Sequence, residues 1–185
     1  MLIKTPTMYE FYQQLLSPAP DKKNELMFSV VLIDDDQLFR EQMKDYLHSM
    51  NVSDVKTYSS GEDFLKTLND DDKKFVVCDF DFGSTNLMNG LQVLEEIKKR
   101  NPGTPVIILS SQDKIQIALE TLQKGAVDYF IKGMENTFTS VLTSILKINE
   151  LQRLRKSEKD YIRTLIVGSI ISVAVIAFLM YNLYK

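Results

Sequence analysis

The sequence predicts an α/β fold, a doubly wound five-stranded parallel sheet, followed by one C-terminal transmembrane helix. Short apolar runs recur along the chain, and amphipathic stretches with helical spacing separate them. Such alternation is typical of parallel strands joined by right-handed helical crossovers, which place helices on both faces of the sheet. A long uncharged run near the C-terminus predicts the transmembrane helix.

The strands are predicted from short runs that are rich in β-branched and aromatic residues. A weaker run of this kind lies between the first and second amphipathic stretches, and it completes the set of five. We expect the strands at 30–33, 55–58, 75–78, 106–109 and 127–131.

The helices are predicted from apolar residues at helical spacing and from breakers at their ends. Asn101-Pro102-Gly103 stops the third helix, Gly125 closes the fourth, and Thr137 opens the last. A short helix is also expected at 8–16, ahead of a Pro-containing linker. We expect the remaining helices at 37–50, 59–68, 90–100, 111–123 and from 137 onward.

Composition and charge bound the organisation of the chain. With 185 residues, 44% apolar and 25% charged, there is room for one globular domain and an appendage. A net charge of −3 gives no electrostatic footprint for nucleic acid, so no nucleic-acid partner is expected. We divide the chain into an N-terminal extension and linker (1–26), a globular domain (27–150), a charged juxtamembrane helix (151–163) and a membrane anchor (164–185).

The anchor is predicted from residues 165–184, which carry no formal charge. Twenty residues of helix span about 30 Å, the thickness of a bilayer's hydrocarbon core. Five basic residues lie between 153 and 163, whereas only Lys185 follows the run. Basic flanks stay on the cytoplasmic side, so we expect a single-pass protein of the bacterial inner membrane with its globular domain in the cytoplasm.

Polar residues directly follow four of the apolar runs. Asp34-Asp35-Asp36 follows the first, Asp79 the third, Ser110 the fourth and Lys132 the last. The carboxyl ends of parallel strands meet at one edge of a sheet, where ligands bind. Carboxylates, a hydroxyl and an ammonium at that edge are suited to hold a divalent cation and to accept a phosphoryl group.

The ordered set Asp34-Asp35, Asp79, Ser110 and Lys132, with Lys124-Gly125-Ala126-Val127-Asp128-Tyr129 before the lysine, resembles the receiver domain of two-component response regulators. The resemblance covers about residues 29–148. It implies the flavodoxin-like strand order 2-1-3-4-5.

The resemblance also implies a role for each site residue. Asp79 would be the phosphoacceptor, and Lys132 would pair with the phosphate. Asp34, Asp35 and Asp79 would bind Mg²⁺, with a backbone carbonyl near Asp81 completing the sphere. Ser110 would bond a phosphate oxygen, and Tyr129 would act as the switch. The protein would be no enzyme in the usual sense, although autophosphorylation and autodephosphorylation are expected.

Three features depart from the family pattern. Phe82-Gly83 stands where many receivers carry Met-Pro, and the loop that follows to Asn89-Gly90 is about three residues longer than usual. Gly133 follows the lysine, where a proline after a cis bond is usual. These departures bear on loop geometry and phosphoryl lifetime.

No output domain is recognised after the receiver, so the sequence predicts a membrane-tethered, stand-alone response regulator. Its partners would be a histidine kinase or phosphotransfer protein, a downstream protein, the membrane through 165–184, and a second copy in a phosphorylation-dependent homodimer. A phosphate sink is compatible with the same residues.

Two alternatives remain open from the sequence. One is a degenerate receiver that is not phosphorylated and serves as a scaffold. The other is a phosphatase of the haloacid-dehalogenase type, because Asp79-Phe80-Asp81 resembles its Asp-x-Asp signature. That enzyme needs a further acidic pair after the lysine, and here only Glu135 lies near.

Overall fold

The computed structural model describes residues 28–69, 74–83, 87–111 and 114–183, and the helix expected at 8–16 lies outside them. Five parallel strands form one sheet in the order β2-β1-β3-β4-β5, as predicted. The strands are β1 (Ser29–Ile33), β2 (Asp54–Tyr58), β3 (Lys74–Asp79), β4 (Val106–Ser110) and β5 (Asp128–Ile131).

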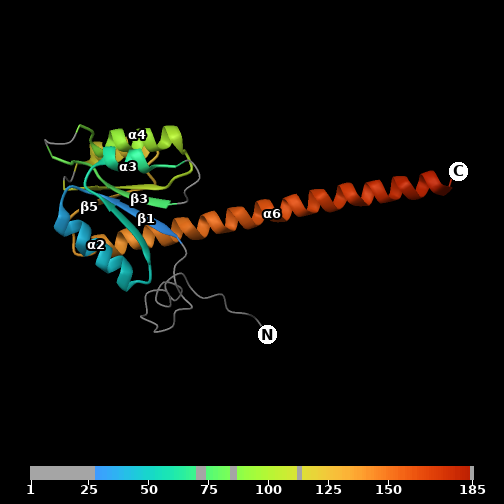
Figure 1. The fold of residues 1–185 in the computed structure, drawn as a ribbon, viewed down its shortest axis with the longest axis horizontal. Coiled ribbons are helices and arrows are strands. Elements are labelled where there is room, and N and C mark those ends of the chain that lie inside the picture. Colours follow the sequence, from blue (N-terminus) through green and yellow to red (C-terminus); the bar gives the residue numbers. More distant parts are fainter. Residues whose placement is uncertain (1–27, 70–73, 84–86, 112–113, 184–185) are drawn as a thin grey trace. The chain divides into compact units, whose positions relative to one another are not determined.

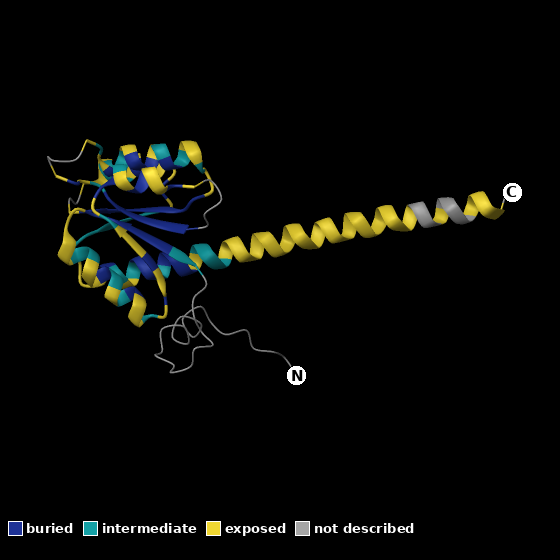
Figure 2. Cartoon of the chain, in the orientation of Figure 1, coloured by how far each residue is buried: buried dark blue, intermediate teal, exposed yellow. Residues whose placement is uncertain are grey.

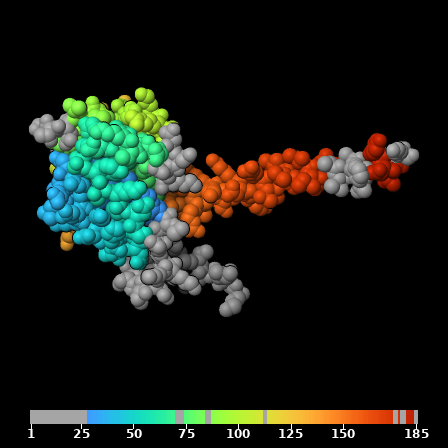
Figure 3. All heavy atoms as spheres, in the orientation of Figure 1, coloured from blue at the N-terminus to red at the C-terminus, as the bar shows by residue number. Residues whose placement is uncertain are grey.

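Helices cover both faces of the sheet. Figure 1 shows α3 and α4 on one face, and α2 with the first turns of α6 on the other. In the space-filling view, residues from α2 to α3 form much of the visible face of the domain (Figure 3). The helices are α2 (Gln37–Ser49), α3 (Gly61–Thr67), α4 (Gly90–Arg100), α5 (Ile115–Gln123) and α6 (Thr137–Leu183).

The central strands β1, β3 and β4 are buried on both faces, which explains why they read as continuous apolar runs (Figure 2). The edge strands β2 and β5 are more exposed. Alternate residues of β1 point to opposite sides. Val31 and Ile33 join the core cluster that contains Phe64 of α3 and Leu94 of α4. Burial of such side chains contributes roughly 1.5–3 kcal/mol each, and this core fixes where the strands end.

Side-chain caps set the starts of three helices. Asp36 accepts a hydrogen bond from Phe39 N–H at 3.1 Å, and Ser60 accepts one from Asp63 N–H at 3.2 Å. Asn89 forms a reciprocal capping box at the start of α4. Asp36 directly follows Asp35, and Asn89 ends the loop that begins after Asp79, so these two caps also help to fix the loops beside the site.

The helix predicted at 111–123 begins later than expected. It starts at Ile115, and Lys114 before it has extended backbone angles and no side-chain cap. Residues 112–113 lie outside the described part of the chain. The predicted start at Ser111 is therefore four residues early.

The chain divides into two compact units, Met1–Ile145 and Leu146–Lys185. In the second unit the chain is helical to Leu183, and residues 151–163 are exposed. Within the described residues, no helix is both long and apolar enough to cross a membrane, so the predicted anchor at 164–185 is not confirmed. Part of that span, residues 184–185 and the side chains at 174, 175 and 177–179, falls outside the description.

Candidate functional site

The carboxyl ends of β1 and β3 bring three carboxylates together. Asp34 and Asp79 are buried, Asp35 is exposed, and one oxygen from each lies within 4.8 Å of the others. Ile33 pairs in register with Cys78, so the residues that follow each strand are neighbours. The sequence placed these residues at one edge of the sheet, and the structure confirms that they meet there.

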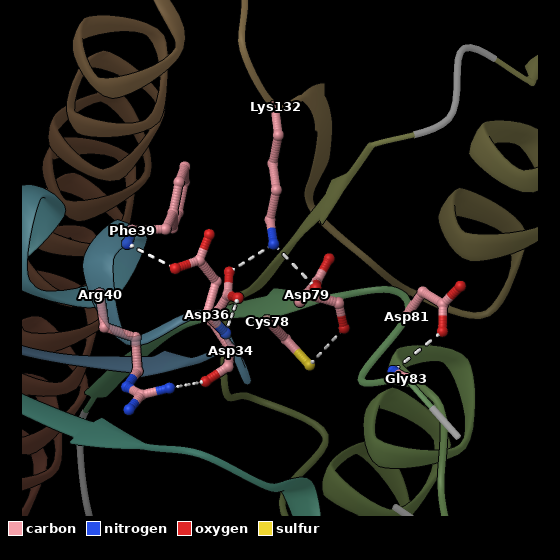
Figure 4. A network of polar contacts seen from close by, with 9 residues as sticks. All are labelled: Asp34, Asp36, Phe39, Arg40, Cys78, Asp79, Asp81, Gly83 and Lys132. Carbon is pink, nitrogen blue, oxygen red and sulfur yellow. Dashed lines mark hydrogen bonds and ion pairs between the residues drawn. The ribbon is translucent and has the colours of Figure 1, made fainter. Parts of the chain in front are cut away.

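Lys132 lies between two of these carboxylates (Figure 4). Its Nζ is 2.6 Å from Asp34 Oδ2 and 2.8 Å from Asp79 Oδ2. The backbone N–H of Lys132 donates to the Ser110 carbonyl at 2.8 Å, which ties the lysine to the end of β4. The long side chain therefore crosses from the β4–β5 side of the site to the β1–β3 side.

Burial and charge act in opposite directions on these groups. The pKa of the Asp79 carboxyl is raised to about 6, because burial and the neighbouring Asp34 raise it by more than Lys132 lowers it. Burial also raises the pKa of Asp34 above its usual value, despite its ion pair with Lys132. For Lys132, burial lowers the pKa, but Asp34 and Asp79 together leave it above the usual range. The site thus holds two carboxylates against one ammonium in a place with little water.

The donor set fits a hard divalent cation. Asp79 Oδ1 is buried and has no hydrogen-bond partner among the described residues. A buried, unpaired carboxylate oxygen is costly unless a cation or another donor satisfies it. Three carboxylates within reach of one point, one of them open to solvent, match the preference of Mg²⁺ for oxygen ligands and retained water.

The loop after β3 runs beside this cluster. Gly83 has φ +69°, a conformation that favours glycine, and a Cβ there would lie 3.2 Å from Asp35 Oδ2. Gly83 N–H donates to Asp81 Oδ1 at 3.2 Å, and Phe82 is buried in the core. The departure from Met-Pro therefore gives a tight turn with a buried aromatic anchor. The role predicted for the Asp81 carbonyl stays a prediction.

Ser110 and Tyr129 lie on the adjacent strands β4 and β5. Ser110 is buried at the end of β4, and Tyr129 is half-buried on β5, in register with Ile108. Tyr129 packs against the core cluster on the α3–α4 side of the sheet. Their predicted phosphate and switch roles concern a phosphorylated state and stay predictions.

Sequence reasoning missed two neighbours of the site on α2. The Phe39 ring centre lies 4.8 Å from Lys132 Nζ, and Arg40 donates a hydrogen bond to the Asp34 carbonyl. This cation–π contact stabilises the ammonium without adding a further negative charge to the site. Arg40 follows Asp34 closely in the sequence, so spacing offered a signal for its contact, whereas the contact of Phe39 with Lys132 depends on the tertiary fold.

Sequence reasoning also missed how closely α4 approaches the backbone of Asp79. A Cβ at Gly90 would lie 2.1 Å from the Asp79 carbonyl oxygen, and Gly90 N–H donates to the Phe80 carbonyl at 2.8 Å. Glycine is required here by close approach rather than by φ. The sequence identified Gly90 only as the start of a helix.

A five-stranded parallel sheet with this order, carrying an acidic cluster and a lysine at its carboxyl edge, defines a signalling receiver of the two-component type. The model of the response regulator receiver domain family matches residues 30–142, and the chain belongs to this family. Receiver domains bind Mg²⁺ at an acidic pocket, and Asp34, Asp35 and Asp79 form such a cluster. Membership of this family leaves no support for the phosphatase alternative.

The chain is similar to several transcriptional regulators over its receiver part. The regulatory protein ZraR of Salmonella typhimurium is 29% identical over 106 residues, 57% of this chain and 23% of ZraR. The regulatory protein MalR of Bacillus subtilis is 29% identical over 135 residues, 72% of this chain and 55% of MalR. The chain therefore spans about a quarter to about half the length of these relatives.

Solved structures agree on the fold. The receiver domain of NtrX from Brucella abortus has a TM-score of 0.58 and 24% identity, covering 64% of this chain and 98% of that one.

Proposed function

We propose that this receiver accepts a phosphoryl group on Asp79 from a histidine kinase or phosphotransfer protein. The observation that carries the proposal is the Asp79 carboxylate itself, with Oδ2 held by Lys132 and Oδ1 buried without a hydrogen-bond partner in the described part of the chain. A carboxylate so placed is oriented before the reaction, and its neighbours are the groups that phosphoryl transfer needs.

In the transfer, an Asp79 oxygen forms a bond to phosphorus as the bond between phosphorus and the donor's histidine nitrogen breaks. The imidazole leaves and takes up a proton from water. Lys132 neutralises charge on the incoming phosphoryl oxygens, which requires its ammonium to leave at least one of its two carboxylates. Mg²⁺, held by Asp34, Asp35 and Asp79 with the Asp81 carbonyl, would supply further charge neutralisation. Water later hydrolyses the acyl phosphate.

Output would pass through Ser110 and Tyr129 to the surface of α5. Three large apolar side chains of α5 are exposed, Ile115, Leu119 and Leu122. Exposed apolar residues on one short helix suit a protein partner, such as a downstream target or a second copy in a phosphorylation-dependent homodimer. A phosphate sink uses the same site without this surface, and a scaffold that is never phosphorylated is the remaining alternative.

Membrane tethering is part of the proposal and rests on the sequence. Its support is the uncharged run at 165–184 and the basic flank before it. Alkaline phosphatase fused after Lys185 should be active, and a fluorescent protein that folds only in the cytoplasm should be dark. A chain that fractionates as soluble, or the reverse reporter pattern, would remove the tether from the proposal.

The phosphoacceptor is tested by intact mass after incubation of the full chain with acetyl phosphate and Mg²⁺. Wild type should gain one phosphoryl group, and Asp79→Asn should gain none. Asp45→Asn, which removes an exposed carboxylate of α2, is the matched control and should react as wild type does. An inert wild type would favour the degenerate scaffold.

A further inference from the structure

A carboxylate outside the acidic cluster holds the end of the long loop that follows the phosphoacceptor. Glu62 Oε1, in the first turn of α3, accepts hydrogen bonds from the backbone N–H groups of Leu87 and Met88, both at 2.9 Å. Glu62 Oε2 is buried and has no hydrogen-bond partner among the described residues. One side chain thus ties α3 to a stretch of backbone 25 residues further along the chain.

The two hydrogen bonds to Glu62 form a strong connection for a single side chain. Hydrogen bonds from backbone N–H groups to a carboxylate are charge-assisted and stronger than those between neutral groups. A carboxylate gives up hydration to make them, and Glu62 Oε2 is buried without a hydrogen-bond partner from the residues that the structure describes. A surface glutamate without a structural or functional role would keep both oxygens in water. The partial burial of Glu62 therefore favours a role for the loop that it holds.

The held residues lead directly to the phosphoacceptor. Met88 precedes Asn89, the cap of α4, and Gly90 follows. Gly90 N–H donates to the Phe80 carbonyl, and its missing Cβ lets α4 reach the Asp79 carbonyl oxygen. Glu62 therefore fixes the start of the helix whose first residue touches the backbone of the reacting residue.

We propose that Glu62 is a positioning residue for phosphorylation, which acts by clamping Leu87 and Met88 so that α4 holds the Asp79–Phe80 backbone in place. The inference rests on the proposed phosphorylation of Asp79. It gives a physical reason why a loop longer than usual, with Phe82-Gly83 in place of Met-Pro, still serves the site. Glu62 does not touch the reacting atoms, and its effect passes through the loop and α4.

The clamp is tested in the full chain with Glu62→Ala, Glu62→Gln and Arg100→Ala. Arg100 donates to the Leu65 carbonyl at 2.9 Å, so it also ties α4 to α3 by a side-chain-to-backbone bond, but at the opposite end of α4 from Asp79. It is a matched control for general loosening of the two helices. Glutamine keeps an oxygen that can accept both bonds.

With acetyl phosphate as the phosphodonor, Glu62→Ala should lower the maximal phosphorylation rate by about 10-fold and change the half-saturating concentration by less than about twofold. Glu62→Gln should recover the rate to within about threefold of wild type, because the acceptor remains but its charge does not. Arg100→Ala should keep the wild-type rate even where it lowers resistance to urea. Amide exchange at Leu87 and Met88 should speed up only in Glu62→Ala.

Three results would overturn the inference: a wild-type rate in Glu62→Ala, equal slowing in Arg100→Ala, or a glutamine variant as slow as the alanine variant. These are distinct from failure of the proposed function, in which wild type itself takes no phosphoryl group. In that case unchanged amide exchange in Glu62→Ala would also reject the clamp, and faster exchange would leave a structural tie without a role in phosphorylation.

Discussion

The Lys132 ammonium lies 2.8 Å from the Asp79 carboxylate and shares its second contact with Asp34 at 2.6 Å. One positive charge thus balances two buried negative charges before any cation or phosphate arrives. Burial nevertheless raises the pKa of Asp79 to about 6, so the lysine compensates only part of the desolvation. The site is therefore under electrostatic strain in its metal-free state, and this has measurable consequences.

The first prediction concerns stability without metal. Because the folded protein raises the pKa of Asp79 from 3.8 to about 6, it holds that proton more tightly than the unfolded chain does. The stabilising contribution of Asp79 to the free energy of unfolding is therefore fully present below about pH 4, and it is lost as the pH rises through about 6. Asparagine cannot titrate, so Asp79→Asn should gain stability over wild type across this window, by up to about 3 kcal/mol.

Urea unfolding in EDTA at pH 4, 5, 6 and 7 measures this difference. Addition of Mg²⁺ at pH 7 should shrink it, since the cation stabilises the ionised wild-type site. A difference that is the same at every pH would contradict the prediction.

The second prediction concerns the metal. Asp35→Asn should weaken Mg²⁺ binding by about 10-fold, because it removes one of three carboxylates that lie within reach of a single cation. Calorimetry suits the measurement, as the chain has no tryptophan. Asp36→Asn is the control: asparagine also caps α2, and Asp36 is not part of the cluster. Equal weakening in both variants would count against Asp35 as a ligand.

The third prediction follows from the approach of α4 to the Asp79 backbone. Gly90→Ala places a Cβ 2.1 Å from a backbone oxygen that cannot rotate away. We expect a loss of stability of about 2–4 kcal/mol and slow phosphorylation in whatever remains folded. Gly103→Ala is the control, because its Cβ would meet nothing nearer than 3.6 Å, and it should stay within about 0.5 kcal/mol of wild type. Wild-type stability in Gly90→Ala would refute the contact.

The fourth prediction concerns the lifetime of the phosphoryl group. The Asp81 carboxylate is exposed and turned toward Gly83 N–H, two residues beyond the phosphoacceptor (Figure 4). Asp81→Ala should alter the dephosphorylation rate by about two- to fivefold without abolishing phosphorylation, because it loosens the turn beside Asp35. Gln112, which is two residues beyond Ser110 and which we expect to border the same path, lies outside the described residues. An unchanged decay rate in Asp81→Ala would show that this turn does not border the path of the attacking water.

The sheet and the acidic cluster could be predicted because they depend on short-range patterns. The central strands read as apolar runs since both faces are buried, and four of the five runs end directly before a site residue, as at Asp34 and Asp79. Register then follows from the parallel order, so Lys132 falls beside residues nearly a hundred positions earlier in the chain.

The remainder could not be predicted because it depends on tertiary distance. Nothing in the sequence around Glu62 points to Leu87, and Gly90 looks like any glycine that begins a helix. The cation–π contact between Phe39 and Lys132 joins residues from opposite ends of the domain. The start of α5 was predicted four residues early, at Ser111, whereas the helix begins at Ile115.

The central claim, that Asp79 is the residue phosphorylated, is tested most directly by trapping the acyl phosphate. The wild-type chain is incubated with acetyl phosphate and Mg²⁺, reduced with borohydride to convert a phosphorylated aspartate to homoserine, digested and sequenced by mass spectrometry. The account predicts homoserine at position 79 alone, dependent on both phosphodonor and Mg²⁺. Homoserine at Asp34, Asp35 or Asp81 with an intact Asp79, or none at any position, would contradict it.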